Sequence, residues 1–367
     1  MPIDLPEPDE AARAHSAELV ARIAETIRAE GGAIPFSRYM ELALYAPGLG
    51  YYSAGAQKFG RAGDFVTAPE LGPLFAQCVA EAVAPLLGAM PGAQFLELGG
   101  GSGAFAQDAL VHLALLDALP ARYAILEPSA DLRGRQRERL EAMLPAALFE
   151  RVAWLDGPPQ EDWRGVLFAN EVLDALPATR FAVRGGALFE EFVARDGGGN
   201  FLRVDQPADA FLDAAVRHIE RYLGAPLPDG LRSEVLPQLP YWIQAVGGLL
   251  REGAMLFADY GQPRRDYYAP ERSQGTLRGF YRQRLIEDPF LWTGLADLTA
   301  SVDFTALAEA GVGAGFELAG YSTQAGFLLG NGLAECFQRL HDLAPDEASR
   351  YALSQQAKQL TLPGAMG

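Results

Sequence analysis

Short apolar runs alternate with longer amphipathic segments through the centre of the chain. Five of the runs are predicted to be buried strands, at residues 95–98, 122–127, 152–155, 165–169 and 254–259. The segments between the earlier strands have the length of helices, and such alternation is typical of a parallel sheet. Two more apolar runs, residues 316–321 and 325–329, are expected to close the sheet as an antiparallel pair. We therefore expect an α/β fold with a Rossmann-like, mostly parallel sheet.

Helical spacing of apolar residues dominates the N-terminal region, and a long loop rich in glycine and aromatic residues follows it at residues 46–70. An insertion after the fourth strand contains alternating runs and a helix, which predicts a small antiparallel meander. These patterns predict four parts: residues 1–92 as helices with a cofactor-covering loop, 93–177 and 236–331 as a Rossmann-like cofactor-binding domain, 178–235 as an inserted α+β lid or substrate-binding subdomain, and 332–367 as a C-terminal helical tail.

The first strand leads into a turn with glycine at alternate positions, Gly99, Gly101 and Gly103. Glycine adopts positive φ readily and leaves no Cβ between the backbone and a ligand. Glu97 precedes the turn, and a carboxylate there repels the pyrophosphate of a dinucleotide but suits the ammonium of a cofactor that ends in an amino acid. S-adenosylmethionine (SAM) is such a cofactor, and Ser102 offers it a hydroxyl. The glycine spacing also keeps an NAD site as a minor alternative.

Acidic residues end the next two strands as well. Glu127 ends the second strand, where a carboxylate can accept hydrogen bonds from both ribose hydroxyls of a nucleoside. Asp156 ends the third strand, in a place to meet an adenine amino group. A strand-end acid is also a common turn residue or helix cap. Three such acids on successive strands nevertheless favour a SAM site.

The fourth strand ends in Asn170-Glu171, beside the first strand, where bound SAM would present its methyl group. Both are candidate catalytic residues, and Asn170 is also a candidate cofactor ligand. A guanidinium presents a planar fork of donors that a carboxylate accepts, so Glu171 is expected to orient an arginine nucleophile. Helix capping by the two residues is the structural alternative. Glu70, at the end of the long loop, is a third catalytic candidate.

The long loop itself is expected to form one wall of the cofactor pocket, because its aromatic content argues for order. Its candidate cofactor-binding residues are Asp64, Thr67 and Pro69.

Composition restricts the partners. Acidic residues outnumber basic ones 47 to 30, which gives a formal net charge of −17 and makes a nucleic acid an unexpected partner. The two cysteines, Cys78 and Cys336, predict neither a metal site nor a disulfide framework from their number and spacing. The N-terminus lacks the pattern of a secretory signal, and no apolar run reaches the ~18 residues that cross a bilayer. We therefore expect a cytoplasmic protein without membrane insertion.

Five motifs occur in order between roughly residues 35 and 330: residues 63–70, the glycine turn, Asn170-Glu171 with residues 174–177, residues 258–261, and residues 296–304. Together they resemble the MidA-like family of class I SAM-dependent methyltransferases. The resemblance implies that fold, with SAM as the cofactor. For mitochondrial members it implies symmetric dimethylation of an arginine on the quinone-pocket subunit of respiratory complex I, during assembly of the complex. A protein acceptor of this kind is the expected partner, and a homodimer is left open.

Two positions depart from the family pattern. Ser102 stands where the family commonly has arginine, and Gln283 stands where it commonly has histidine. An acceptor site that needs a titrating imidazole would be altered by the second change.

Three functions are compatible with the sequence. The leading one is SAM-dependent methylation of a protein arginine. A second is methylation of a small molecule, with the insertion as a lid. A closed apolar cavity would favour this small-molecule acceptor, whereas an open acidic groove would favour a peptide. The third is a non-catalytic assembly factor that retains the methyltransferase fold.

Overall fold

The computed structural model describes residues 5–54 and 67–362, which belong to two compact units. The parallel-sheet unit consists of Gln57–Asn170, Gln244–Ala258 and Glu317–Gly367. The antiparallel-sheet unit consists of Met1–Ala56, Glu171–Ile243 and Asp259–Phe316. The boundaries of these two units differ from those of the four parts predicted from the sequence. The functional roles of the four parts stay predictions.

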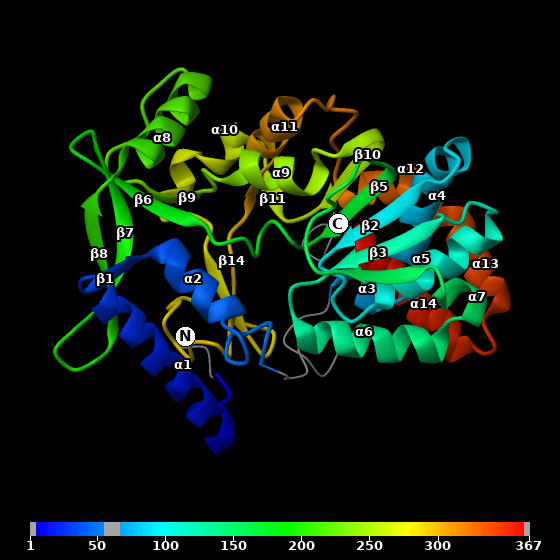
Figure 1. Ribbon diagram of the computed structural model, residues 1–367, viewed down its shortest axis with the longest axis horizontal. Coiled ribbons are helices and arrows are strands. Elements are labelled where there is room, and N and C mark those ends of the chain that lie inside the picture. The colour runs from blue at the N-terminus through cyan, green and yellow to red at the C-terminus, as the bar shows by residue number, and fades with distance from the viewer. Residues whose placement is uncertain (1–4, 55–66, 363–367) are drawn as a thin grey trace. The chain divides into compact units, whose positions relative to one another are not determined.

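The parallel-sheet unit is built on five parallel strands in the order β10-β5-β2-β3-β4 (Figure 1). In chain order they are β2 (Gln94–Leu98), β3 (Arg122–Leu126), β4 (Val152–Leu155), β5 (Trp163–Asn170) and β10 (Leu250–Ala258). Each of them overlaps one of the five strands predicted from apolar runs. The predicted α/β architecture with a parallel central sheet is therefore confirmed.

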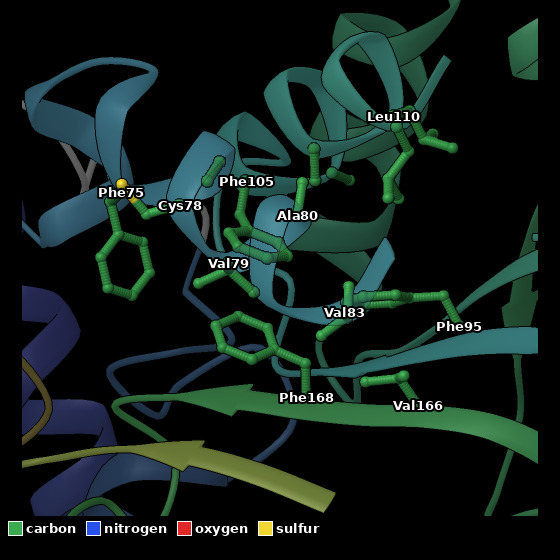
Figure 2. Close-up of a cluster of buried hydrophobic side chains, with 14 of the residues drawn as sticks. Phe75, Cys78, Val79, Ala80, Val83, Phe95, Phe105, Leu110, Val166 and Phe168 are labelled. Atoms are coloured by element: carbon green, nitrogen blue, oxygen red, sulfur yellow. The ribbon is translucent and has the colours of Figure 1, made fainter. Parts of the chain in front are cut away.

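Helices connect and cover these strands. They are α3 (Ala68–Leu71), α4 (Leu74–Ala89), α5 (Ala104–Leu115), α6 (Ala130–Met143), α7 (Ala146–Phe149), α12 (Gln324–Gly330), α13 (Leu333–Leu343) and α14 (Glu347–Thr361). Helix α9 (Leu239–Gly247) begins in the antiparallel-sheet unit and ends in this one, before β10. Aromatic rings fill the core between α4, α5 and the sheet, as Figure 2 shows. The rings of Phe105 and Phe168 stack with their centroids 4.2 Å apart, and Phe75 and Phe95 lie against them. Such pairs add about 0.5–1.5 kcal/mol beyond the burial of their area.

Two glycines fix the register across the middle of the sheet. Gly253 of β10 lies beside Gly165 of β5, which lies beside Gln94 of β2. A Cβ on Gly165 would come within 1.8 Å of the Gln94 carbonyl oxygen, and a Cβ on Gly253 within 1.7 Å of the Gly165 carbonyl oxygen. Because no other residue fits these places, the strands cannot shift past one another while keeping this packing.

The predicted antiparallel closing pair is wrong. Residues 316–321 form no regular secondary structure, and residues 325–329 lie in helix α12. The Thr323 hydroxyl accepts a hydrogen bond from the backbone N–H of Gly326 and so caps that helix. Leu328 is fully buried whereas its neighbour Leu329 is 66% exposed, so the run is apolar on one helical face. Short apolar runs do not distinguish a helix from a strand.

The antiparallel-sheet unit contains the predicted meander. Strands β6 (Thr179–Arg184), β7 (Ala187–Arg195) and β8 (Phe201–Pro207) pair antiparallel in sequence, and β1 (Ala33–Pro35) and β9 (Arg232–Val235) complete the sheet (Figure 1). The other helices of the unit are α1 (Glu10–Ala29), α2 (Phe36–Tyr45), α8 (Ala210–Leu223), α10 (Arg264–Tyr267), a 3-10 turn (Pro270–Arg272) and α11 (Phe304–Gly313). Its short strands are β11 (Gly261–Gln262), β12 (Arg278–Tyr281), β13 (Arg284–Ile286), β14 (Asp297–Thr299) and β15 (Val302–Asp303).

One buried arginine ties three strands of this sheet together. Arg180 on β6 donates from Nη1 to both carboxylate oxygens of Glu191 on β7, at 2.8 and 3.1 Å, and from Nε to Glu234 on β9 at 3.0 Å. Both glutamates are at most 1% exposed. A charge removed from water at this depth is tolerated only when a partner compensates it. The guanidinium is therefore a structural requirement of the unit.

We expect Arg180→Met to lower the free energy of unfolding of this unit by about 3–5 kcal/mol, because it removes the Arg180 cation from the buried carboxylates of Glu234 and Glu191, of which Glu191 keeps Arg232. Chemical denaturation followed by circular dichroism measures the effect. The matched control is Arg38→Met, which removes a solvent-exposed pair with Glu41 in the same unit and should cost less than about 1 kcal/mol. Equal losses in the two variants would show that burial of the network is unimportant.

Candidate functional site

The turn after β2 has the backbone conformation that the sequence predicts. Gly99, Gly101 and Gly103 have φ of 65°, 52° and 81°, values that favour glycine. The Gly99 N–H donates to the Leu126 carbonyl at 3.0 Å, which attaches the turn to β3. A Cβ on Gly100 would lie 2.9 Å from the side chain of Ile125. The turn is therefore a cradle of bare backbone at the carboxyl end of the first strand, where ligands of parallel sheets bind.

Glu97 lies inside the sheet rather than at the surface. Its side chain is 3% exposed, and its Oε2 accepts a hydrogen bond of 2.8 Å from the Tyr123 hydroxyl on β3. Burial raises the pKa of Glu97 to about 8, the hydrogen bond from Tyr123 lowers it in part, and the nearby charge of Glu127 raises it further. A buried carboxyl of this kind gains most from a cation that replaces its lost hydration.

Glu127 is held by a neighbour that was not among the predicted site residues. Gln136, fully buried on α6, donates from its amide to Glu127 at 3.2 Å and to the Gly101 carbonyl at 2.9 Å, and its amide oxygen accepts from the Trp154 indole at 2.9 Å. Glu127 also accepts from the backbone N–H of Ser129 at 3.0 Å. Gln136 thus joins the glycine turn to the ends of β3 and β4. Its signal in the sequence was a polar residue between Leu132 and Leu140, four positions from each on the buried face of the helix.

The end of the long loop contacts the same turn. The Ser102 hydroxyl hydrogen-bonds to the carboxylate of Glu70 in α3, and Arg139 of α6 donates to the Ser102 oxygen at 3.2 Å. Arg139 therefore brings a guanidinium next to the position where the family commonly has arginine. Thr67 precedes α3 as its N-cap residue and Pro69 lies in its first turn, whereas Asp64 lies outside the described residues.

Asp156 differs from the other strand-end acids. Its side chain is 93% exposed and pairs with Arg133 at 2.9 Å. The protein holds it less firmly than Glu97 or Glu127, and its contact with an adenine stays a prediction.

Asn170 ends β5 in the parallel-sheet unit, and Glu171 begins the next segment of the antiparallel-sheet unit. Glu171 has φ of 52°, a left-handed conformation that costs a residue with a side chain about 1–2 kcal/mol. Strain of this kind persists only where the surrounding structure imposes it, and it is concentrated at functional sites. The backbone conformation therefore supports the sequence-based choice of Glu171.

Asp259 imposes the conformation of the loop that follows Glu171. Its Oδ2 accepts hydrogen bonds from the backbone N–H groups of Val172, Leu173 and Asp174 at 3.2, 2.9 and 3.3 Å. Burial raises the pKa of Asp259 to about 7, although these hydrogen bonds and one from Tyr260 lower it. From the sequence, Asp259 at the end of the fifth strand is expected to line the acceptor pocket or to form a turn, and these hydrogen bonds give it a part in shaping the loop.

Further carboxylates surround this loop. Burial raises the pKa of Asp174, and the charges of Asp259, Glu171 and Asp297 raise it further. Asp297, at the start of β14, accepts a hydrogen bond of 3.1 Å from the Tyr52 hydroxyl. We call Glu171, Asp174, Asp259 and Asp297 the acidic cluster. It brings several carboxyl groups together in a largely buried setting, which is suited to a cationic group.

Gln283, the second departure from the family pattern, lies in the tight turn between β12 and β13. Arg282 and Gln283 have φ of 47° and 62°, as the two central residues of a type I′ hairpin turn do. At such a position the backbone conformation of the turn restricts which residue fits. This observation does not support a catalytic role for Gln283.

Comparison with known proteins identifies the family. The model of a family described as "Putative S-adenosyl-L-methionine-dependent methyltransferase" matches residues 78–322. A Burkholderia thailandensis protein whose crystal structure contains S-adenosyl-homocysteine is 42% identical, with a TM-score of 0.91 over 99% of this chain and 93% of that chain. A native crystal structure from the same organism is 41% identical, with a TM-score of 0.88 over 99% and 92% of the two chains.

Curated relatives are more distant. "Protein arginine methyltransferase NDUFAF7, mitochondrial" of Mus musculus is 28% identical over 92% of this chain and 79% of its own length. Its homologue in Drosophila melanogaster is 29% identical over 81% of this chain and 71% of its own length. The expectation of a cytoplasmic protein is contradicted by these relatives, because their names place them in mitochondria. Among the residues that the structure describes, none of the helices has the length and apolar character required to span a membrane.

The glycine turn, the buried acids around it and these comparisons agree. The chain belongs to the MidA-like family, and it is a SAM-dependent methyltransferase with a Rossmann-like fold.

Proposed function

We propose that this enzyme transfers the methyl group of SAM to an arginine side chain of a protein acceptor. The observation that carries the proposal is the left-handed backbone of Glu171 within the acidic cluster. A guanidinium is a permanent cation with a planar set of donors, and clustered carboxylates are its natural counterpart. The names of the curated relatives, which are protein arginine methyltransferases, favour the same acceptor.

The parallel-sheet unit supplies the groups that would hold SAM. The turn at Gly99, Gly101 and Gly103 lets a ligand approach the backbone closely, Glu127 is oriented by Gln136 to accept ribose hydroxyls, and Glu97 suits the cofactor's ammonium. Thr67, Pro69 and Glu70 would lie along the same pocket through the contact of Glu70 with Ser102. SAM itself supplies a methyl group that its sulfonium already activates.

The protein's part in the chemistry is orientation and charge balance. Glu171 would accept hydrogen bonds from the guanidinium and align one nitrogen for in-line attack, with Asn170 as its neighbour at the end of β5. A guanidinium has a pKa above about 12 and does not lose its proton readily before attack. The remaining carboxylates of the acidic cluster would balance the delocalised charge until a proton leaves the methylated product.

The acceptor protein that we propose to test first is the quinone-pocket subunit of complex I, which the family resemblance implies. A small-molecule acceptor is the second candidate, and no separate observation favours it. Labelled SAM incubated with each acceptor, followed by peptide mass analysis, tests the proposal. Label on an arginine would support it, and label on lysine or on a small metabolite would refute it. Light scattering of the purified protein would test the homodimer.

Cofactor binding should depend on pH through Glu97. Because its pKa is about 8 without ligand and a bound ammonium favours the ionised form, binding below pH 8 requires release of one proton. The affinity for S-adenosylhomocysteine should rise by up to about tenfold per pH unit between pH 6 and pH 7.5, and level off near pH 8 as the ligand amine also loses its proton. Calorimetry in two buffers of different ionisation enthalpy measures the proton release. Glu97→Gln should remove both effects, and a wild-type affinity independent of pH would contradict this role.

Gln136→Leu should weaken binding of S-adenosylhomocysteine by roughly tenfold or more. The substitution removes one hydrogen bond each from Glu127, the Gly101 carbonyl and the Trp154 indole, and each such loss costs about 1–3 kcal/mol. Glu127 keeps its hydrogen bond from the Ser129 N–H but loses the side chain that orients it toward the turn. Calorimetry measures the affinity and circular dichroism verifies the fold. Gln338→Leu, at an exposed residue of α13 in the same unit, is the matched control and should bind normally. Normal binding by Gln136→Leu would mean that Glu127 needs no support.

Glu171→Gln should reduce methyl transfer by about 10²-fold or more while cofactor affinity changes little, because it keeps the shape and removes the charge. Single-turnover transfer to a verified acceptor measures the rate. Glu30→Gln, at the exposed end of α1, is the control for a lost surface charge. A normal rate in Glu171→Gln would reduce this residue to a structural role.

A further inference from the structure

Three helices of the parallel-sheet unit bring a second set of reactive side chains together, apart from the cofactor turn. Cys78 and Glu81 lie one turn apart on α4, His112 lies near the end of α5, and Cys336 lies on α13. Both cysteines and the histidine are at most 1% exposed. Figure 2 shows Cys78 on α4, beside the aromatic core. Nothing in the proposed methyl transfer uses these residues.

The donor atoms already converge. One ligand atom from each of Glu81, His112 and Cys336 lies within 4.8 Å of the others. His112 Nε2 is 2.9 Å from Glu81 Oε1, and Cys336 Sγ is 3.9 Å from the same oxygen. A side-chain hydrogen bond joins Cys78 to Cys336. Thiolate, imidazole and carboxylate are the three ligand types that zinc takes in proteins.

We propose that Cys78, Glu81, His112 and Cys336 form a structural binding site for a zinc-like divalent cation. Four donors satisfy the tetrahedral coordination of closed zinc sites. Ligand distances of about 2.0–2.3 Å place donors ~3.5 Å apart in that geometry. Glu81, His112 and Cys336 already converge to within 4.8 Å, and Cys78, which hydrogen-bonds to Cys336, would complete the set. The proposal does not depend on the identity of the methyl acceptor.

Arg339 supplies the charge that such a centre needs. Its Nη2 is 3.5 Å from Glu81 Oε1, and its Nη1 is 3.2 Å from His112 Nδ1. Two thiolates and one carboxylate leave a divalent centre with one excess negative charge, which one guanidinium neutralises. The Arg339 side chain is 35% exposed, so it can move from His112 to Glu81 alone when the imidazole binds the cation. Second-shell partners of this kind are typical of metal ligands.

The site would fasten the C-terminal helices to the sheet. Cys336 comes from α13, whereas the other three donors come from helices that flank the first strand of the sheet. Spacing along the chain could not predict this, because the cysteines lie far apart in sequence and no short ligand motif connects them.

Cobalt(II) is the probe that tests the site. The full-length protein, reduced and stripped with a chelator, should bind one Co²⁺ per chain, with visible bands of tetrahedral cobalt and a thiolate-to-cobalt charge-transfer band. Zn²⁺ should displace it and raise the melting temperature, because a ligand that binds only the folded state stabilises it. Cys336→Ser should abolish the charge-transfer band or weaken it strongly. Glu81→Gln, at a partly exposed donor that is less critical for folding, should weaken Co²⁺ binding about tenfold or more.

His218→Gln is the matched control, because His218 forms an exposed pair with Glu309 at 3.0 Å in the other unit and its loss should leave Co²⁺ binding unchanged. Absence of a stoichiometric thiolate-to-cobalt band in the wild type would overturn the proposal. So would equal Co²⁺ affinity in the wild type and in Glu81→Gln. A Cys78–Cys336 disulfide in the protein as isolated would overturn it as well, because it removes both sulfur donors.

Discussion

The carboxylate of Asp259 is the constraint on which the candidate acceptor site depends. It accepts hydrogen bonds from three consecutive backbone N–H groups in the loop that follows Glu171. Asp259 comes directly after β10 and Glu171 directly after β5, and these two strands pair in parallel with Ala258 beside Asn170. The two glycines of β5 and β10 fix the register of the sheet. This register places Asp259 and Glu171 at the same level along the two strands. Glu171 keeps its left-handed backbone because the residues after it are held in place.

Burial of several acids together has an energetic cost that hydrogen bonds offset only in part. Asp259 accepts four backbone hydrogen bonds and still has a pKa near 7. The pKa of Asp174 is raised by burial and by its acidic neighbours. An arrangement of this kind is stable when some carboxyls stay protonated or when a cation arrives. The acidic cluster is thus a site whose structure favours a positively charged occupant over a neutral one, which separates a guanidinium from most small-molecule acceptors.

The sequence predicted the sheet, its ligand edge and the glycine turn, because these features follow from local patterns. Apolar runs located all five parallel strands, and the acids at their ends made Glu97, Glu127 and Glu171 candidate site residues. Gln136 and Asp259 were underestimated because their roles depend on partners distant in sequence. The run at residues 325–329 became a helix because a local threonine cap outweighed its apolar composition. The compartment expected from the sequence is contradicted by the curated relatives, whose names place them in mitochondria.

The two units share apolar packing, and the antiparallel-sheet unit adds a buried ion network with its own dependence on temperature. The parallel-sheet unit is held by aromatic and aliphatic packing, whose contribution per unit of buried area levels off at high temperature. The antiparallel-sheet unit has apolar clusters of its own and adds the buried ions around Arg180, for which the desolvation penalty falls as temperature rises. The ion network is therefore least costly in hot solution, so its relative contribution to the stability of the unit that carries Glu171 should grow on heating.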